Sequence, residues 1–413
     1  MGISIGLVGL GSFGQVFADL FRSHPGVDRV ALCDRELDRM EALASRLQRD
    51  RKFNPRDKYN TLEEMLKTDV DAVAIITQHW LHAPQCVQAM EAGKHVYSAV
   101  PVITVPDADE ILDWCERIVE TSQRTGQFYM LGETTYYHAD TMFCRRKAAE
   151  NAFGHFVYAE GEYFHDVDAL CNLREVIRMR TASSSGKEWL ENKRRYQAAG
   201  ILDGPMHYPT HSTSGPVSVM NAHAVKVTAY GYKNRNEDPF FADNAFSNEV
   251  ALFRMSNGAS VRICEFRELA GSFHKGETFR IVGTRGIYAE NMWKENFRTD
   301  SSPAKPLQVT TLSDKEMRDP LPPEVAIAFK QIDDPEADKD SDFIPKGHGG
   351  SHPYLVHEFV DAITHQRQPA INAWEAARYR VMGAMAHKSA LRDGETLDVP
   401  DFGDAPQKKS INK

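Results

Sequence analysis

A glycine-rich turn near the start of the chain constrains its fold more than any other feature. The apolar stretch Ile3 to Val8 runs into Gly9-Leu10-Gly11-Ser12-Phe13-Gly14, and a helical pattern begins near Phe13. In such a turn the first glycine permits a tight bend, the second lets the backbone approach a phosphate, and the third lets the helix pack closely on the strand. The free N–H groups and the positive end of the helix dipole then face the anion. The stretch therefore predicts a dinucleotide pyrophosphate site made of Gly9, Gly11, Ser12, Phe13 and Gly14.

A carboxylate follows at the distance that such a site requires. Asp34 comes directly after a second apolar run, residues 30–33, about 20 residues beyond the turn. A carboxylate there accepts hydrogen bonds from the adenosine ribose and repels a 2′-phosphate, so NAD is favoured over NADP. Arg35 keeps NADP open as the alternative cofactor, and a glycine turn without any ligand is the second alternative.

Strand and helix patterns alternate through the first third of the chain. Strands are expected at 70–76, 95–97 and 128–131, and helices at about 36–51, 62–66, 82–92 and 108–125. This alternation predicts a Rossmann domain over residues 1–132, in which a doubly wound parallel sheet binds ligands at the carboxyl ends of its strands. The segment from Thr77 to His82 is the next turn at that edge.

The pattern changes after Gly132. A charged helix is expected at 139–151, followed by strands at 156–164, 224–232, 248–255, 260–267, 277–282 and 286–290. Antiparallel pairing predicts a second, α+β domain over 133–413 with an open, mostly antiparallel sheet, which serves substrate binding and oligomerisation. Helices between 353 and 391 are expected to pack back on the body, residues 169–197 to form a loop, and residues 301–347 to form a surface excursion. An open sheet face favours a homodimer or homotetramer.

Size, charge and cysteine use narrow the class of protein. A chain of 413 residues predicts two domains, and a net charge of −9 argues against nucleic acid and anionic membranes as partners. No apolar run reaches the ~20 residues of a membrane span, and the first strand begins too early to leave room for a signal peptide, so a cytoplasmic protein is expected. Single cysteines, without a CxxC pair, are expected to be buried thiols: Cys33, Cys86, Cys115, Cys144, Cys171 and Cys264.

Ala92-Gly93-Lys94-His95-Val96, together with Thr77, His82 and the N-terminal turn, resembles the glucose-fructose oxidoreductase / inositol dehydrogenase / MocA family. The resemblance covers nearly the whole chain and implies a nicotinamide at the junction of the two domains, near Thr77, His82, Val100 and Pro101. Most dehydrogenases of the family follow this strand with Glu-Lys-Pro, where the lysine assists proton transfer. This chain has Ala99-Val100-Pro101 instead, and Val100 cannot move a proton.

Four further segments, residues 133–137, 159–166, 208–211 and 347–350, resemble the NAD-dependent glycosidases of the same family, typified by α-N-acetylgalactosaminidases. The resemblance implies that Glu133, Tyr163, Tyr208 and His211 surround a sugar and the nicotinamide. The implied reaction oxidises C3 of a glycoside, removes the acidified proton at C2, eliminates the C1 substituent, adds water and reduces C3 again, so that NAD is restored.

The residue types suit this chemistry. His211 is the candidate for proton transfer because the unperturbed pKa of histidine lies near working pH. Tyr163 ends an alternating strand and needs a positive neighbour, such as the nicotinamide ring, to act as a base. Glu133 follows the last strand of the parallel sheet and is expected either to orient a sugar or ribose hydroxyl or to serve as a charge at a helix N-terminus. The partner is therefore a small sugar or glycoside.

Two other functions stay open. Asp203 and His207 keep the acid-then-histidine spacing of the family's dehydrogenases, so a sugar or cyclitol dehydrogenase is the first alternative. A non-catalytic regulator that binds NAD and a sugar is the second. His207 and His211 are four residues apart, but Pro209 works against one regular helix through both, and no metal is expected. Arg194 and Arg195 suit either an anionic sugar substituent or a solvated basic pair, and His348 and His352 a structural role.

Overall fold

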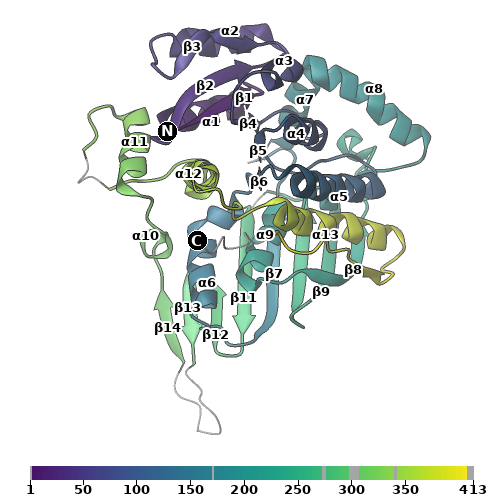
Figure 1. Cartoon of the computed structure of the whole chain (residues 1–413). Coiled ribbons are helices and arrows are strands. Elements are labelled where there is room, and N and C mark those ends of the chain that lie inside the picture. Colours follow the sequence, from purple (N-terminus) through teal and green to yellow (C-terminus); the bar gives the residue numbers. More distant parts are fainter. Residues whose placement is uncertain (1, 170–171, 272–275, 297–306, 339–341, 407–413) are drawn as a thin grey trace.

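The computed structural model contains two β-sheets with helices packed between and around them (Figure 1). The structure is described for residues 2–169, 172–271, 276–296, 307–338 and 342–406. The first sheet is the purple and dark blue part of Figure 1, and the second is the teal and green part.

The first sheet is parallel and has the strand order β3-β2-β1-β4-β5-β6, which is that of a Rossmann fold. Its strands are β1 (Ile3–Val8), β2 (Val27–Cys33), β3 (Phe53–Tyr59), β4 (Ala72–Ile75), β5 (His95–Ser98) and β6 (Tyr129–Leu131). Its helices are α1 (Ser12–Ser23), α2 (Leu37–Leu47), α3 (Leu62–Leu66), α4 (His82–Glu91) and α5 (Ala108–Thr125). Because helices cover both faces, β4 is buried along its whole length.

The second sheet has nine strands in the order β14-β13-β12-β11-β7-β10-β9-β8-β15. They are β7 (Phe156–Phe164), β8 (Ala224–Tyr232), β9 (Asn248–Met255), β10 (Ser260–Phe266), β11 (Glu277–Gly283), β12 (Gly286–Ala289), β13 (Met292–Glu295), β14 (Gln308–Thr311) and β15 (Leu397–Asp398). All neighbours are antiparallel except β7 and β10. The predicted fold class, a doubly wound parallel sheet followed by an α+β part with a mostly antiparallel sheet, is confirmed.

Helices of the second part join the two sheets. They are α6 (Ala139–Ala149), α7 (Leu173–Ala182), α8 (Ser184–Ala198), α9 (Thr210–Met220), α10 (Asp314–Met317), α11 (Pro323–Asp333), α12 (His352–Thr364) and α13 (Ala373–Leu391). Short 3₁₀ turns are η1 (Thr135–Tyr137), η2 (Pro205–His207), η3 (Pro239–Phe241) and η4 (His348–Gly350). α13 packs against both α5 and β8, which ties the end of the chain to both parts (Figure 1).

One glycine sets the position of α9 on the second sheet. A Cβ at Gly161 of β7 would lie 1.8 Å from the backbone oxygen of Ser212, so only glycine allows this approach. α9 begins at Thr210 directly after Pro209, because a proline without an N–H is tolerated where the helix starts. This close packing brings His211, at the first turn of α9, over β7.

Two segments differ from the sequence expectations. Residues 169–197 were expected as a loop, but the described part forms α7 and α8, which lie beside the first sheet in Figure 1. Apart from Gly186, neither helix has a buried residue. Leu173, Val176 and Ile177 of α7 do have the apolar spacing of a helix, whereas α8 has few apolar residues. The described part of 301–347 contains β14, α10 and α11 rather than only irregular chain.

The outer face of the second sheet is open near β8 and β9, where Tyr230, Tyr232, Val250 and Leu252 are exposed. Among the described residues no helix is long and apolar enough to cross a membrane. The five described cysteines are buried and free, and Cys171 lies outside the described residues.

Candidate active site

The turn after β1 needs glycine at two places for different reasons. Gly9 has a φ of +89°, and a Cβ there would lie 2.4 Å from the carbonyl oxygen of Ile76. A Cβ at Gly14 would lie 1.9 Å from the carbonyl oxygen of Gly9. Gly11 is different, because the nearest described atom to a Cβ there is an Arg39 nitrogen at 3.9 Å. Gly9 and Gly14 are therefore required by packing, whereas Gly11 leaves open space beside the backbone.

The residues around this turn fit a dinucleotide. The first turn of α1, which includes Ser12 and Phe13, has no side-chain cap and no acidic residue, so its N–H groups and the helix dipole are left for an anion. Asp34 Oδ2 accepts from Leu10 N at 2.6 Å, and Oδ1 accepts from Glu36 N at 2.8 Å. These bonds fix the carboxylate and leave it further acceptor sites for ribose hydroxyls.

Arg35, the residue that left NADP possible as the cofactor, forms an ion pair with another side chain. Its guanidinium forms a bidentate pair with Glu188 of α8, at 2.5 Å and 3.0 Å. Glu36 accepts from the backbone N and the hydroxyl of Ser184, at the start of the same helix. The α7–α8 segment therefore contacts the chain beside Asp34.

His82 joins the turns that follow β4 and β5. Its Nδ1 lies 2.8 Å from the oxygen of Pro101, next to Val100, and its Nε2 lies 3.2 Å from the oxygen of Thr77. Burial lowers the pKa of His82 to about 4, so the ring is neutral. The structure thus brings Thr77, His82, Val100 and Pro101 together at the carboxyl edge of the first sheet.

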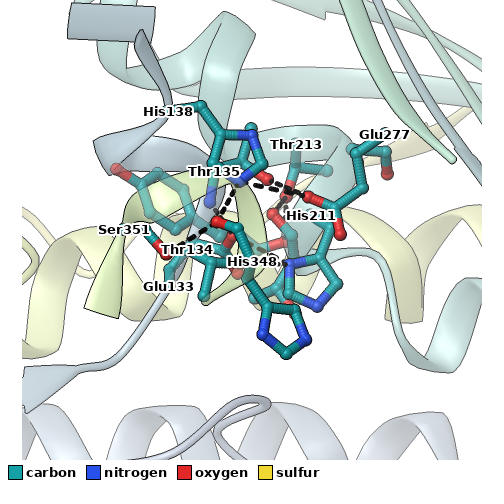
Figure 2. Close-up of polar contacts among 12 residues, drawn as sticks. Glu133, Thr134, Thr135, His138, His211, Thr213, Glu277, His348 and Ser351 are labelled. Atoms are coloured by element: carbon teal, nitrogen blue, oxygen red, sulfur yellow. Dashed lines mark hydrogen bonds and ion pairs between the residues drawn. The ribbon is translucent and has the colours of Figure 1, made fainter. Parts of the chain in front are cut away.

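Glu133 and His211 form a buried pair at the end of β6. His211 Nδ1 lies 2.9 Å from Glu133 Oε1 and 3.4 Å from Thr134 Oγ1. Glu133 Oε1 also accepts from Thr135 N at 2.9 Å, whereas Glu133 Oε2 is buried without a partner among the described residues. Figure 2 shows this pair with Glu277 and His348 around it.

The surrounding carboxylates keep His211 charged. Burial alone would lower the pKa of His211, but Glu133 and Glu277 outweigh burial and raise it to about 9. Glu277 accepts from Thr135 Oγ1 at 2.9 Å and lies 3.8 Å from His138 Nε2. Burial would raise the pKa of Glu277, but His211 and His138 lower it. The site therefore holds a histidinium between carboxylates.

Two tyrosines complete the cluster. The ring of Tyr163 lies 5.0 Å from His211 and 6.2 Å from Tyr208, and Tyr208 lies 5.5 Å from His211. Arg267, which binds the buried Glu265, lies over the Tyr163 ring at 4.9 Å. Burial raises the pKa of both tyrosine hydroxyls well above their usual value, so both hold their protons at neutral pH.

Asp203 and His207 belong to a different buried group. His207 Nδ1 lies 2.7 Å from Asp203 Oδ1, and its ring lies 4.3 Å from His387, which pairs with Glu249 at 2.8 Å. The described side-chain contacts of His207 connect it to this group on α13 and β9 and not to Tyr163 or His211. His207 lies in η2 and His211 in α9, so they do not share a helix. Among the described residues, no three His, Cys, Asp or Glu side chains are arranged to hold a metal.

Several members of the cluster were not predicted from the sequence. Glu277 was recognised only as the start of a strand, and His79 and Arg180 were not singled out. Arg194 and Arg195 are exposed on α8, where Arg195 binds Asn192. His348 has its Nδ1 2.9 Å from His352 Nε2, and both rings contact Phe13. Only strand pairing and helix packing bring Glu277 and Arg180 to the site, so no local pattern marks them, whereas His79 lies in the turn from Thr77 to His82 that the sequence already placed at this edge.

Comparison with protein families gives two matches. Residues 3–131 match the model of the oxidoreductase family with an NAD-binding Rossmann fold. Residues 275–409 match the model of the glycosyl hydrolase 109 C-terminal domain. The prediction of an NAD-binding Rossmann fold is therefore confirmed.

Similar proteins align with nearly the whole chain. An α-N-acetylgalactosaminidase of Tannerella forsythia is 24% identical over 97% of this chain and 86% of its own length. A glycosyl hydrolase family 109 protein of Parabacteroides distasonis is 23% identical over the same shares.

Among solved structures, a levoglucosan dehydrogenase in complex with NADH has a TM-score of 0.71 at 16% identity, over 97% of this chain and all of that chain. An aldose-aldose oxidoreductase from Caulobacter crescentus has a TM-score of 0.65 at 14% identity, over the same shares. These likenesses establish the two-part fold.

Proposed function

We propose that the chain is a member of the glucose-fructose oxidoreductase / inositol dehydrogenase / MocA family that hydrolyses glycosides by transient oxidation of the sugar. The matches to the NAD-binding Rossmann model over residues 3–131 and to the glycosyl hydrolase 109 C-terminal domain over residues 275–409 support this. The similarity to the α-N-acetylgalactosaminidase of Tannerella forsythia supports an α-glycoside as the substrate of this chain. We assign residues 1–132 to NAD binding and residues 133–413 to substrate binding and oligomerisation.

Glu133 paired with His211, at a site where Val100 replaces the lysine of the family's dehydrogenases, is the observation that carries this proposal. Without the lysine, proton transfer falls to His211 and Glu133, and the tyrosines donate hydrogen bonds to the sugar. NAD, when bound at the turn of Gly9 to Gly14 and at Asp34, supplies reversible hydride acceptance at the sugar carbon.

His211 and Glu133 are the proton-transfer residues in this proposal. Oxidation at C3 releases the C3 hydroxyl proton, and the carboxylate of Glu133, whose Oε2 has no partner among the described residues, accepts it. His211, with a pKa of about 9, is the acid that protonates the leaving oxygen, or the oxygen at C3 when that carbon is reduced again. Its Nδ1 is held by Glu133, and its Nε2 has no partner among the described residues and is the atom assigned to the substrate. After donating, the neutral ring is a base next to two carboxylates.

Glu133 and the tyrosines bind the sugar. A buried carboxylate oxygen without a partner costs free energy, so Glu133 Oε2 is assigned to a hydroxyl of the sugar or of the nicotinamide ribose. Tyr163 and Tyr208 hold their protons and are assigned as donors to sugar oxygens.

The test is a panel of nitrophenyl α- and β-glycosides incubated with purified protein and NAD⁺, in which nitrophenol and NADH are followed together. We expect nitrophenol release without net NADH formation, and loss of that release in His211→Gln. NADH that accumulates from free sugars without nitrophenol would contradict the proposal.

The specific observation that favours a sugar or cyclitol dehydrogenase is the intact Asp203–His207 contact at 2.7 Å. In that case Asp203 and His207 would transfer the proton, and NADH would accumulate. Tight NAD binding without turnover of any sugar would instead identify a non-catalytic regulator.

Location and assembly are part of the proposal. Buried free thiols at all five described cysteines support a cytoplasmic protein. The exposed side chains of Tyr230, Tyr232, Val250 and Leu252 on the open sheet support a homodimer or homotetramer through that face.

A further inference from the structure

Arg180, at the end of α7, lies beside the aromatic side of the active-site cluster. Its Nη1 lies 3.4 Å from His79 Nδ1, and the His79 ring lies 5.3 Å from the Tyr208 ring. Arg180 also interacts electrostatically with the hydroxyls of Tyr208 and Tyr163 and with the neutral ring of His82. The α7–α8 segment thus brings a guanidinium to the same tyrosines that are assigned to the sugar.

Arg180 differs from the arginines around it, because it has no carboxylate partner among the described residues. On the same helix Arg174 pairs with Asp168 and Asp238, and Arg178 pairs with Glu175. On the other side of Tyr163, Arg267 pairs with Glu265. Each of these arginines has a carboxylate partner, whereas Arg180 has none among the described residues.

The surroundings of Arg180 make this unpaired charge costly. Burial lowers the pKa of its guanidinium, and burial together with Arg180 lowers the pKa of His79 well below its usual value, so His79 is neutral. A guanidinium stays charged in proteins, and a partly desolvated charge without a counter-ion is unfavourable. A bound anion would neutralise the charge of the guanidinium. The planar guanidinium can donate two parallel hydrogen bonds to the oxygens of a carboxylate, phosphate or sulfate.

We propose that the substrate is an acidic glycoside, and that Arg180 binds the oxyanion of that substrate next to Tyr208 and His79. This rests on the proposed function and adds the charge class of its substrate. The anionic group can be a substituent of the sugar ring, as in a uronide or a sugar phosphate, or part of the leaving group.

The experiment compares matched pairs of nitrophenyl glycosides that differ only in the anion. The ring arm pairs a glucoside with a glucuronide, a galactoside with a galacturonide, and each hexoside with its 6-phosphate, in both anomers. The leaving-group arm pairs nitrophenyl with carboxynitrophenyl glycosides of neutral sugars. We expect kcat/KM to be at least about 100-fold higher for the acidic member of one pair, the range of a lost charged hydrogen bond.

Variants assign that preference to Arg180. Arg180→Gln is expected to lower the ratio of kcat/KM for the acidic substrate to kcat/KM for its neutral partner about 100-fold, and Arg180→Lys to restore part of that ratio. Arg178→Gln is the matched control, because Arg178 lies on the same helix, is exposed and pairs with Glu175. Circular dichroism and NAD⁺ titration by tryptophan fluorescence accompany each variant.

The outcomes separate this inference from the proposed function. Nitrophenol release that is equal from neutral and acidic substrates, in the wild-type protein, overturns the acidic substrate class even if Arg180→Gln fails to fold. Weaker NAD⁺ binding in Arg180→Gln with unchanged substrate preference would mean that Arg180 contacts the cofactor, and would also overturn it. NADH that accumulates only from acidic sugars, and depends on Arg180, would retain the acidic class while the hydrolase proposal fails.

Discussion

His211 Nδ1 lies 2.9 Å from Glu133 Oε1, and this buried contact joins the first turn of α9 to the end of β6. Glu133 follows a strand of the first sheet, whereas His211 lies on a helix that packs against the second sheet. The two residues are 78 positions apart in sequence. The pair therefore reports both on the packing of the two parts of the chain and on the chemistry of the site.

The pH dependence of stability follows from this pair. Folding raises the pKa of His211 from 6.5 to about 9, so the stabilisation is complete below pH 6.5 and is lost as pH rises through 9. The shift corresponds to about 3 kcal/mol. Urea unfolding at pH 6 and pH 9.5 should show a loss of this order in the wild-type protein and a smaller loss in Glu133→Gln. Glu91→Gln, which removes an exposed partner of Arg124, is the control and should behave as the wild type does.

Glu133→Gln should also change the pH profile of catalysis. Removing the carboxylate lowers the pKa of His211, so the basic limb of kcat/KM against pH should move down by at least about one pH unit, with kcat reduced about 100-fold. Glu162→Gln is the control, because Glu162 pairs with Arg262 on the face of β7 opposite to Tyr163 and His211. This variant should leave the pH profile of kcat/KM unchanged. A basic limb that stays in place in Glu133→Gln would mean that another group controls it.

Two glycine substitutions should separate packing from cofactor binding. Gly14→Ala places a methyl group 1.9 Å from the oxygen of Gly9, so we expect a loss of about 2 kcal/mol or more in stability before NAD is added. Gly11→Ala meets no described atom closer than 3.9 Å, so stability without NAD should not change. Its NAD⁺ affinity, measured by calorimetry, should fall at least about tenfold because the methyl group obstructs the approach to the phosphates. Unchanged affinity in Gly11→Ala would contradict the assigned pyrophosphate site.

Glu188 should contribute to the choice between NAD and NADP. In Glu188→Gln the guanidinium of Arg35 loses its bidentate partner and becomes available to a 2′-phosphate, while Asp34 still opposes that phosphate. We expect NADP⁺ to bind about five- to tenfold more tightly, and NAD⁺ to bind unchanged, in fluorescence titrations. Glu191→Gln, an exposed change on the same helix, is the control. If NADP⁺ binding does not improve, Asp34 alone decides the selectivity.

His207 and His211 should differ in what they contribute. His211→Gln should lower kcat about 1,000-fold or more with a modest change in KM, because a proton-transfer group is lost. His207→Gln should lower the melting temperature by several degrees and change kcat less than tenfold, since His207 is buried between Asp203 and His387. The reverse order of kcat losses would favour the dehydrogenase.

Local patterns were enough for most of the secondary structure. The helices α3 and α5 and the strands β7, β8 and β9 begin and end where the sequence predicts, because each has an apolar periodicity and clear end signals. β3 and β14 were missed, because both lie at sheet edges and neither has the apolar alternation of a half-buried strand: residues 54–56 of β3 and all of β14 are exposed. β13 was missed as well.

The sequence alone determined the cofactor turn, since Gly9, Gly11, Gly14 and Asp34 act within one strand–helix–strand unit whose geometry is local. It also indicated His211 and Glu133 through a resemblance, without showing that they pair. Only the tertiary structure decided that Glu133 and Glu277 keep His211 protonated, that His207 lies apart from it, and that Arg180 interacts electrostatically with Tyr208 without a carboxylate partner among the described residues. These relationships depend on burial and on long-range packing, and electrostatic energies follow from such distances rather than from the order of residues along the chain.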